Sequence, residues 1–466
     1  IRPGSACCDV VRAAAKDAWG RLISPSLERE IRSELTDKAN EGAIRVFGDN
    51  LHQLLMQPPI RGKVTLGVDP GFRTGCKLAV VDETGRVLET GVGYFTLPNH
   101  EAQKPRAKAQ ILGMIRRHKV TAVAIGNGTA SRESEQFIAS LLPEAPGVAY
   151  VIVSEAGASV YSASKLAAKE FPEYDVSLRS AVSIARRMQD PLAELVKIDP
   201  KAIGVGQYQH DLKQAELENA LSGVVESCVS SVGVDVETAS ASLLTHVAGI
   251  GEALANNIVA YRDENGIASR AQLKKVPKLG PKAFEQCAGF LRVHGSNPLD
   301  ATAVHPESYA AAKALMEKLG YAPQALKRGG IVGILAKAEQ AGMAKLAAEL
   351  GVGEMTLRDI ASELEKPGRD PRDELPVPVL RTDVLSMEDL KPGMELTGTV
   401  RNVIDFGAFV DIGVHQDGLV HISRMADKFI RHPSEVVHVG DVVTVWVVDV
   451  DVKKQRIALS MVKGRT

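Results

Sequence analysis

The C-terminal part of the sequence constrains the fold most, because from Met394 onward short apolar segments alternate with turns. In a β-strand every second side chain points to the same face, so such segments can each bury one face. The expected strands are Met394–Val403, Phe406–Asp411, Gly418–Ser423, Asp441–Val450 and Arg456–Ser460. Five short strands joined by turns predict a compact all-β module.

Two strings in this module, Gly-Ala-Phe-Val at 407–410 and Gly-Leu-Val-His-Ile-Ser at 418–423, closely resemble the S1-type OB-fold, an RNA-binding β-barrel. The resemblance implies that Phe406, Phe409 and His421 face RNA, and that Asp451 and Arg456 form a polar pair beside them. Exposed aromatic rings can stack on unpaired bases. An isolated Phe in a strand is more often a core residue. The glycine between the two Phe residues and the nearby His421 favour a stacking surface here.

Strict alternation would put Phe406 and Phe409 on opposite faces of one strand. Both can meet RNA if Phe406 lies in the preceding loop or if Gly407 forms a bulge. From Met394 onward the chain carries nine basic and nine acidic residues, so stacking rather than net charge must supply much of the binding. Trp446 points outward by the same alternation, and docking on a neighbouring domain is the commoner role for such a residue.

The chain of 466 residues is too long for one core, and changes of pattern divide it into five parts. Leu27, Ile31 and Leu35 recur at helical spacing in the first part. From Lys63 strands and helices alternate, which predicts a mixed sheet covered by helices. Four prolines within 366–380 predict a linker. The expected parts are a helical segment at 1–61, a mixed α/β domain at 62–200, two helical parts at 201–300 and 301–380, and the β-module at 381–466.

The composition limits the ways in which the chain can recognise a partner. The formal net charge is −1, so a nucleic-acid partner has to meet local basic patches, helix N-termini or stacking surfaces rather than an overall positive field. Five cysteines without a Cys-x-x-Cys pair fit a reducing cytoplasm and argue against a zinc site. Because no apolar run reaches membrane-spanning length, we expect no membrane partner.

Two acidic residues end apolar strands of the second part: Asp69 follows Gly67-Val68, and Glu155 follows the segment Val148–Val153. By its order of strand, turn and helix, this part resembles the YqgF/RuvC branch of the ribonuclease-H-like fold. The resemblance assigns the family's acids to Asp69, Glu155 and Asp190. Such carboxylates can hold divalent metals, Mg²⁺ or Mn²⁺, on a phosphodiester, with Asp69 and Glu155 as the first ligands.

A simpler interpretation of the same acids is structural. An Asp before Pro-Gly is often only a turn residue, and Asp190 before Pro191 can end a helix. Resolvases of this type usually carry another acid three residues after the last one, where this chain has Ala193. We therefore expect the fold without an active nuclease centre. In that case Arg73, Lys77 and Arg132, near the same edge, could hold a phosphate backbone.

A glycine-marked turn before a helix occurs twice, about thirty residues apart. Gly249-Ile250-Gly251 forms the first turn, and Lys278-Leu279-Gly280, followed by Lys282, forms the second. The pair resembles a tandem helix-hairpin-helix, in which backbone N–H groups at a helix start face a phosphate oxygen. Lys278 replaces the first glycine, which weakens a left-handed turn but adds positive charge. The glycines could instead only cap packed helices. The doubling favours phosphate contacts, which do not depend on base sequence.

Three long strings and the order of the parts resemble the Tex family of bacterial transcription accessory proteins. The strings lie at 67–77, 154–162 and 205–211. The family also has a helix-turn-helix-like region and further helices that would precede Ile1, so we expect a fragment without its N-terminal portion. The resemblance implies nucleic-acid binding in transcription, without a defined enzymatic step and without a required cofactor.

Three function hypotheses remain: a non-catalytic RNA- and DNA-binding transcription factor, a metal-dependent nuclease or resolvase, and a structural or translational adaptor. Only the second predicts cleavage that depends on Mg²⁺ or Mn²⁺, and co-sedimentation with ribosomes would favour the third. We choose the first, with RNA and DNA as partners and the cytoplasm as location. The sequence leaves open whether RNA polymerase or the ribosome is contacted.

Overall fold

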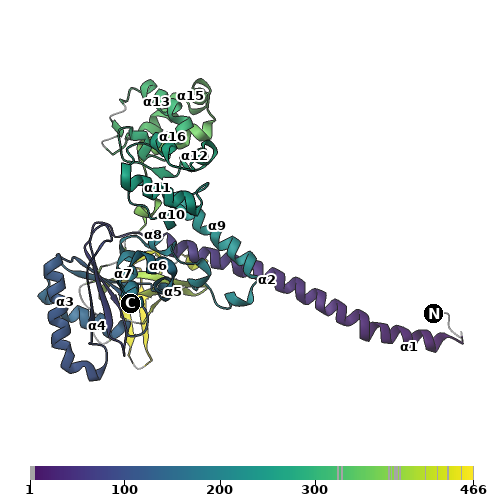
Figure 1. Ribbon diagram of the computed structural model, residues 1–466. Coiled ribbons are helices and arrows are strands. Elements are labelled where there is room, and N and C mark those ends of the chain that lie inside the picture. The colour runs from purple at the N-terminus through teal and green to yellow at the C-terminus, as the bar shows by residue number, and fades with distance from the viewer. Residues whose placement is uncertain are drawn as a thin grey trace.

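A long helical arm forms the N-terminal part of the molecule. The computed structural model describes residues 6–322, 325–326, 329–375, 378, 380–381, 387, 390–414, 416–427, 429–437, 440–452 and 454–464. The arm consists of α1 (Cys8–Ala18), a π-helical turn (Trp19–Ile23) and α2 (Ser24–Leu55), and it projects from the body (Figure 1). Only the end of α2 is covered, where Leu51 and Leu55 share a core with Leu217 of α9 (Gln214–Val232).

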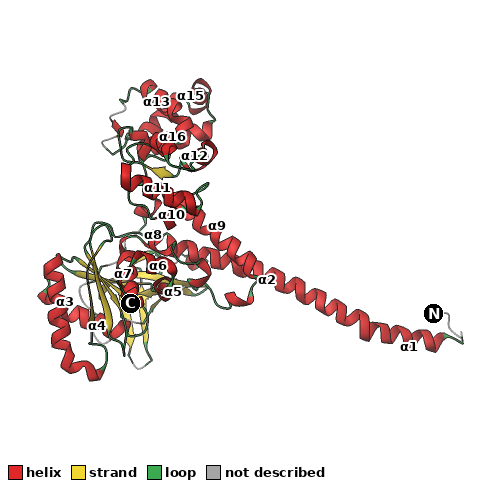
Figure 2. Ribbon diagram, viewed as in Figure 1, coloured by secondary structure: helices red, strands yellow, loops and turns green. Residues whose placement is uncertain are grey.

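The second part contains a five-stranded mixed sheet in the order β3-β2-β1-β4-β5 (Figure 2). Its strands are β1 (Thr65–Asp69), β2 (Cys76–Val81), β3 (Val87–Gly93), β4 (Ala122–Gly126) and β5 (Ala149–Val153). The first three form an antiparallel meander, while β1, β4 and β5 run parallel. The C-terminal ends of these three parallel strands therefore meet at one edge of the sheet.

The two faces of this sheet carry different side chains, and the difference positions α7 (Val176–Gln189). On one face large apolar residues pack with α3 (Lys104–His118) and α4 (Ser131–Leu141). On the other face small residues admit α7. A Cβ on Gly67 would lie 2.3 Å from the backbone oxygen of Ala181, so only glycine permits this close crossing. As a result, α7 lies directly on β1.

The helical parts follow the sheet domain, and Figure 1 shows α13, α15 and α16 on the far side of α10–α12 from the sheet. The further helices are α5 (Ala158–Ala163), α6 (Lys165–Glu170), α8 (Pro191–Leu195), α10 (Ala241–Leu244), α11 (Glu252–Asn265), α12 (Pro281–Cys287), α13 (Tyr309–Lys318), α14 (Ile334–Ala341), α15 (Met343–Leu350) and α16 (Glu354–Glu365). A short parallel pair, β6 (Val234–Asp235) and β7 (Leu291–Arg292), joins the two ends of the hairpin region. Within the described ranges, no helix is long and apolar enough to span a bilayer.

The C-terminal part is a closed five-stranded barrel, as the S1 resemblance implied. Its strands are β8 (Glu395–Ile404), β9 (Gly407–Asp411), β10 (Gly418–His421), β11 (Val442–Asp451) and β12 (Arg456–Ser460). They close in the order β10-β12-β11-β8-β9.

Short 3-10 turns along the described chain lie at Pro98–Gln103, Leu142–Glu144, Pro200–Ala202, Gln209–Asp211, Arg270–Lys275, Pro298–Ala301, Pro306–Ser308, Pro371–Glu374, Ile422–Arg424 and Pro433–Glu435.

The linker predicted at 366–380 contains a folded turn that packs against the rest of the molecule. Pro371–Glu374 forms a 3-10 turn whose Arg372 is only 1% exposed, and Asp370 is buried beside it. Further on, Arg381 forms a β-bridge with Tyr150 of β5, through two backbone hydrogen bonds of 2.8 Å. Asp370 and Asp373 pair with Arg61, and Arg372 pairs with Asp190, so this segment is fastened to the chain around the sheet.

Candidate nucleic-acid interface

The outer face of the barrel carries the residues that the S1 resemblance assigned to RNA. Buried side chains on three adjacent strands define the inside: Ala408, Val410, Val420, Ile457 and Leu459. Phe409, His421 and Arg456 alternate with these residues and therefore face outward. Phe409 pairs with Leu419, and Leu419 pairs in turn with Ala458, two residues from Arg456. The register therefore places the three side chains on one continuous surface.

Phe406 lies in the turn before β9, so the loop is the arrangement that the structure shows. Its ring is 53% exposed, and its backbone oxygen accepts a hydrogen bond from the Ile422 N–H at 2.9 Å. Because Gly407 pairs with His421, the turn holds Phe406 next to the exposed imidazole. The His421 Nδ1 lies 2.9 Å from the Ser423 hydroxyl, which fixes the ring orientation. Two aromatic faces thus lie side by side at the end of β10.

Asp451 and Arg456 are directly opposed across β11 and β12. Asp451 accepts a hydrogen bond from the Lys454 N–H at 3.0 Å and lies 3.3 Å from its Nζ. Arg456 is exposed, and in the described part of the chain its guanidinium has no hydrogen bond or ion pair. This end of the surface therefore offers a cation to a phosphate. The roles of all five residues stay predictions.

Trp446 does not lie on the same strands as the aromatic pair. It pairs with Glu395 of β8 and with Ser460 of β12, and its indole N–H donates to the Glu395 carboxylate at 3.1 Å. The side chain is half-buried against the barrel itself. The docking role expected for it stays a prediction.

The first helix-hairpin-helix turn has the geometry that the glycine spacing predicted. Gly249 has a φ of 80°, in the left-handed region, and Gly251 is the extended N-cap of α11. Val247 and Ile250 are buried, which leaves the two glycines exposed at the tip. A hollow of about 360 Å³ lies along Thr245–Gly251 and also contains Glu226. Backbone N–H groups at the start of α11 can therefore face an anion that reaches the tip.

The second turn repeats this geometry although it lacks the first glycine. Lys278 itself adopts the left-handed conformation, with a φ of 68°, and Gly280 is the N-cap of α12. Leu279 is buried between them, as Ile250 is in the first turn. Lys278 and Lys282 are both exposed. The sequence predicted a weakened turn here, and the structure shows a formed one that carries positive charge.

At the sheet edge, Asp69 ends β1 and Glu155 lies two residues after the end of β5, with β4 between the two strands. Strand spacing puts these two strands about 9.5 Å apart. Burial, the largest cause, raises the pKa of Asp69, which lies at about 6. The charge of Glu155 raises this pKa further, while a hydrogen bond with Ser180 and the charge of Lys77 lower it. The two carboxylates thus share one edge and sense each other's charge.

Glu155 lies tightly against the end of β4. A Cβ on Gly128 would fall 1.5 Å from its Oε1, so a side chain there would displace the Glu155 carboxylate. Burial raises the pKa of Glu155, while the Gly128 N–H and the charge of Arg187 oppose the rise. Arg187 is itself buried in α7 and donates at 2.8 Å to the backbone oxygens of Ser154 and Ala156. A guanidinium therefore occupies the neighbourhood in which a metal site would need a further acid.

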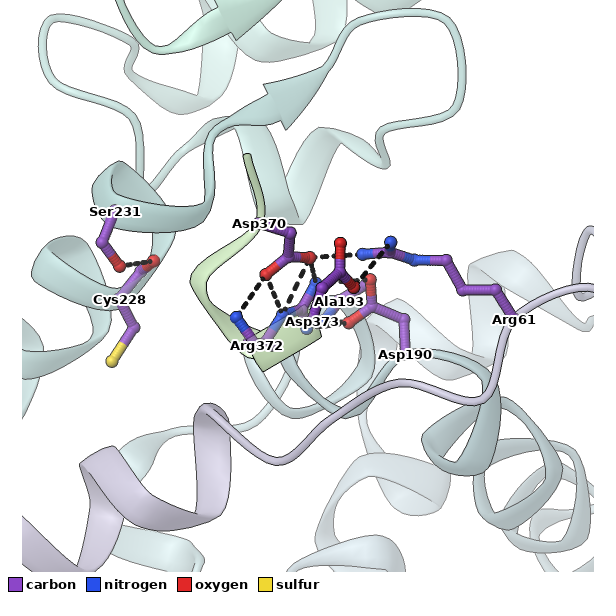
Figure 3. A network of polar contacts seen from close by, with 8 residues as sticks. All are labelled: Arg61, Asp190, Ala193, Cys228, Ser231, Asp370, Arg372 and Asp373. Atoms are coloured by element: carbon purple, nitrogen blue, oxygen red, sulfur yellow. Dashed lines mark hydrogen bonds and ion pairs between the residues drawn. The ribbon is translucent and has the colours of Figure 1, made fainter. Parts of the chain in front are cut away.

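The assignment of Asp190 to this acidic centre is wrong in geometry. Ser180 of α7 reaches Asp69, whereas Gln189 donates at 2.9 Å to the Lys63 oxygen, before β1 begins. The two ends of β1 are about 13 Å apart. Asp190 therefore lies beyond the end of β1 that is opposite to Asp69. It caps α8 by accepting from the Ala193 N–H at 3.2 Å, and it pairs with Arg372 (Figure 3). In the described ranges, no group of three or more His, Cys, Asp or Glu residues could hold a metal.

The suggestion that Lys77 holds a phosphate backbone is also wrong. Lys77 is buried, and its ammonium donates to the backbone oxygens of Thr74 and Gly75 at 3.0 and 2.9 Å. Arg73 and Arg132 are exposed, as that interpretation requires. Sequence reasoning missed Ser180 and Arg187, although their spacing of seven residues, two helical turns, puts them on one face of α7.

Four domain families match the chain in the order that the sequence indicated. They are the Tex protein YqgF-like domain at residues 63–189, a helix-hairpin-helix motif at 229–292, an HHH domain at 297–372 and the S1 RNA binding domain at 389–462. The protein named tex of Bordetella pertussis is 53% identical over 95% of the chain. The chain belongs to the Tex family. The chain spans 56% of the length of that relative.

Tex relatives occur well beyond that species. The Bacillus subtilis protein YdcI is 56% identical over 98% of the chain, which spans 63% of the relative. A human protein named S1 RNA-binding domain-containing protein 1 is 40% identical over 96% of the chain, which spans 51% of it.

Two of the strings that indicated Tex, at 67–77 and 154–162, contain Asp69 and Glu155 at the sheet edge. The third, at 205–211, packs Gly206 against Phe47 of α2, where a Cβ would lie 1.9 Å from the ring.

Proposed function

We propose that this chain is a non-catalytic nucleic-acid-binding factor that holds single-stranded RNA on the outer face of its barrel. The observation that carries the proposal is the shared surface of Phe406, Phe409 and His421, two aromatic rings and an imidazole with no core role for Phe406. Base stacking of this kind tolerates any sequence and needs little net charge. Arg456 at the other end of the surface supplies a cation for the phosphate backbone.

The hairpin region supports a second contact in the same function. Its exposed turn tips, with helix N–H groups at Gly251 and cations at Lys278 and Lys282, fit phosphates of RNA or DNA without reading bases. A relative from Neisseria gonorrhoeae is named transcriptional accessory protein Tex. This similarity supports the proposal that the chain binds nucleic acid in transcription, and we propose RNA polymerase or the ribosome as candidate protein partners.

A metal-dependent nuclease is the second candidate, and the shared edge of Asp69 and Glu155 favours it. The residues fit a divalent ion incompletely. One carboxylate ends β1 and the other lies two residues after β5, while α7 contributes Ser180 and the buried cation Arg187 in place of a further acid. A neighbouring guanidinium opposes the binding of a second positive charge. We therefore derive no reaction step through a metal.

The test is a titration of the chain with labelled single-stranded RNA, single-stranded DNA and a four-way junction, each with and without Mg²⁺ or Mn²⁺. We expect binding without metal. Phe409→Ala and His421→Ala should each weaken RNA binding by roughly 5- to 150-fold, which corresponds to about 1–3 kcal/mol for each stacked base. Tyr208→Ala, which removes an exposed aromatic ring outside the barrel, is the matched control. If both barrel variants are folded and bind like the parent, the stacking surface is wrong.

A further inference from the structure

Phe429 is an exposed aromatic residue that the function above does not use. It lies in the connection between β10 and β11 and is 90% exposed, the largest fraction among the large apolar side chains of the described residues. Met425 and Ile430, on either side of it, are nevertheless buried in the barrel core. The exposed ring therefore directly precedes an anchored residue.

The loop of Phe429 is joined to the turn of Phe406. His432, three residues after Phe429, places its Nε2 3.3 Å from the Asp405 carboxylate, and Asp405 directly precedes Phe406. The Glu435 side chain accepts from the N–H groups of Arg431 and His432 at 3.3 and 3.2 Å, and so stiffens this contact. The two exposed phenyl rings thus sit on neighbouring loops at the same end of the barrel.

The surroundings of Phe429 fit a nucleic acid better than a protein. The described residues near it in the chain, Asp427, Arg431 and His432, are exposed and polar, and Ile430 is buried, so the described part of its loop offers no second exposed apolar side chain. A protein interface usually offers a contiguous apolar area of several hundred Å². A lone ring with a nearby cation is instead the arrangement that stacks a base and contacts its phosphate. The Arg431 guanidinium has no ion pair among the described residues.

We infer that Phe429 is a further base-stacking residue, which extends the single-stranded RNA site beyond Phe406 by at least one nucleotide. The inference rests on the proposed function, because it adds a position to the same site. The strand would run from the outer face of β9 and β10, past Phe406, to the loop between β10 and β11. A short oligonucleotide that occupies only the first positions would not reach Phe429.

The experiment measures the affinity of the chain for oligouridylates of 3, 6, 9 and 12 nucleotides by fluorescence anisotropy, with the Phe429→Ala, Phe429→Leu and Phe429→Trp variants. Each variant is first checked by its circular dichroism and its unfolding midpoint. We expect Phe429→Ala and Phe429→Leu to weaken binding of the longer strands by roughly 5- to 150-fold and to leave the 3-mer unchanged. Phe429→Trp should restore the loss. Met355→Ala, another exposed apolar residue on α16, should change nothing.

Three outcomes would overturn the inference. They are equal affinity of Phe429→Ala and the parent at every length, an equal loss at every length, and full binding by Phe429→Leu, which would make the contact apolar rather than stacked. Failure of the proposed function is distinguishable, because then the parent itself would not bind the 12-mer, or Phe409→Ala and His421→Ala would bind it unchanged.

Discussion

The Arg372 guanidinium donates to the Asp190 carboxylate at 2.7 and 3.3 Å, between residues 182 positions apart in the chain. The same guanidinium binds Asp370, and Asp370 also pairs with Arg61 (Figure 3). This network joins the start of α8, the segment after α16 and the chain that enters β1. Burial alone would lower the pKa of the Arg372 guanidinium. The pairing with Asp370 raises that pKa and holds the side chain in place. Asp190 therefore connects parts of the molecule that are far apart in the sequence.

Arg372→Ala should destabilise the fold by about 3 kcal/mol, because it removes the buried cation between Asp190 and Asp370 and leaves buried Asp370 with only the half-exposed Arg61 as a partner. Equilibrium unfolding in urea measures the change. Arg369→Ala is the matched control, since Arg369 pairs with Glu374 where both side chains are nearly half exposed, and such pairs contribute about 0–1 kcal/mol. Equal effects of the two substitutions would show that the network around Arg372 contributes no more than a surface pair.

Asp69→Asn should stabilise the protein at neutral pH. The folded-state pKa of about 6 lies above the ordinary value of 3.8, so the folded protein binds a proton that the unfolded chain releases between these values. The stability that protonated Asp69 contributes to the parent is thus fully present below about pH 4, and it is lost as the pH rises through about 6. Removal of the titrating group should raise the free energy of unfolding at pH 7.5 by about 1–3 kcal/mol, and by nothing at pH 3.5. A gain that is the same at both pH values would assign it to packing instead.

The amount that the sequence could predict differs between the barrel and the sheet edge, for a physical reason. In strands the period of two limits each side chain to one of two faces. The S1 resemblance then selected the outer face for Phe409, His421 and Arg456 before the structure was known. On α7, direction depends on the 100° step per residue. Asp190 comes ten residues after Ser180, so it points in a different direction from Ser180, away from Asp69, and lies past the end of the helix. Nor does any local pattern reveal that Arg372 will meet Asp190, because that contact depends on tertiary packing.

We expect no cleavage of RNA, single-stranded DNA or four-way junctions above background in Mg²⁺ or Mn²⁺. The reason is that α7 presents Ser180 and Arg187 to Asp69 and Glu155 rather than a third carboxylate. Denaturing gels over a time course provide the measurement. Robust cleavage that disappears in both Asp69→Asn and Glu155→Gln would contradict the expectation. Cleavage that survives both substitutions would identify a contaminating nuclease.

Gly251→Ala is a cleaner probe of the first hairpin than Gly249→Ala. Gly251 is extended, and a Cβ there would meet open space, so the substitution should leave stability within about 0.5 kcal/mol of the parent. It should still obstruct a phosphate at the tip and weaken binding to duplex and single strand alike. At Gly249 a side chain would enter the left-handed region and meet Gln286 at 2.9 Å, so that variant loses stability as well. Unchanged affinity in Gly251→Ala would make the hairpin purely architectural.

Lys278→Gly should change stability and affinity in opposite directions. Lys278 holds a left-handed backbone, which costs a residue with a Cβ about 1–2 kcal/mol, and glycine removes that strain. Part of the gain is lost because glycine adds freedom to the unfolded chain, so we expect a net stabilisation of about 0.5–1 kcal/mol. The same substitution deletes a cation at the turn tip. Nucleic-acid affinity should therefore fall, and the slope of log K against log salt should decrease by about 1.

Lys278→Ala separates the two effects, since it removes the charge but keeps the strained backbone. Its affinity should match that of Lys278→Gly while its stability stays near the parent. If Lys278→Gly binds as tightly as the parent at every salt concentration, the second hairpin does not contact phosphate, and the strain at Lys278 has another cause.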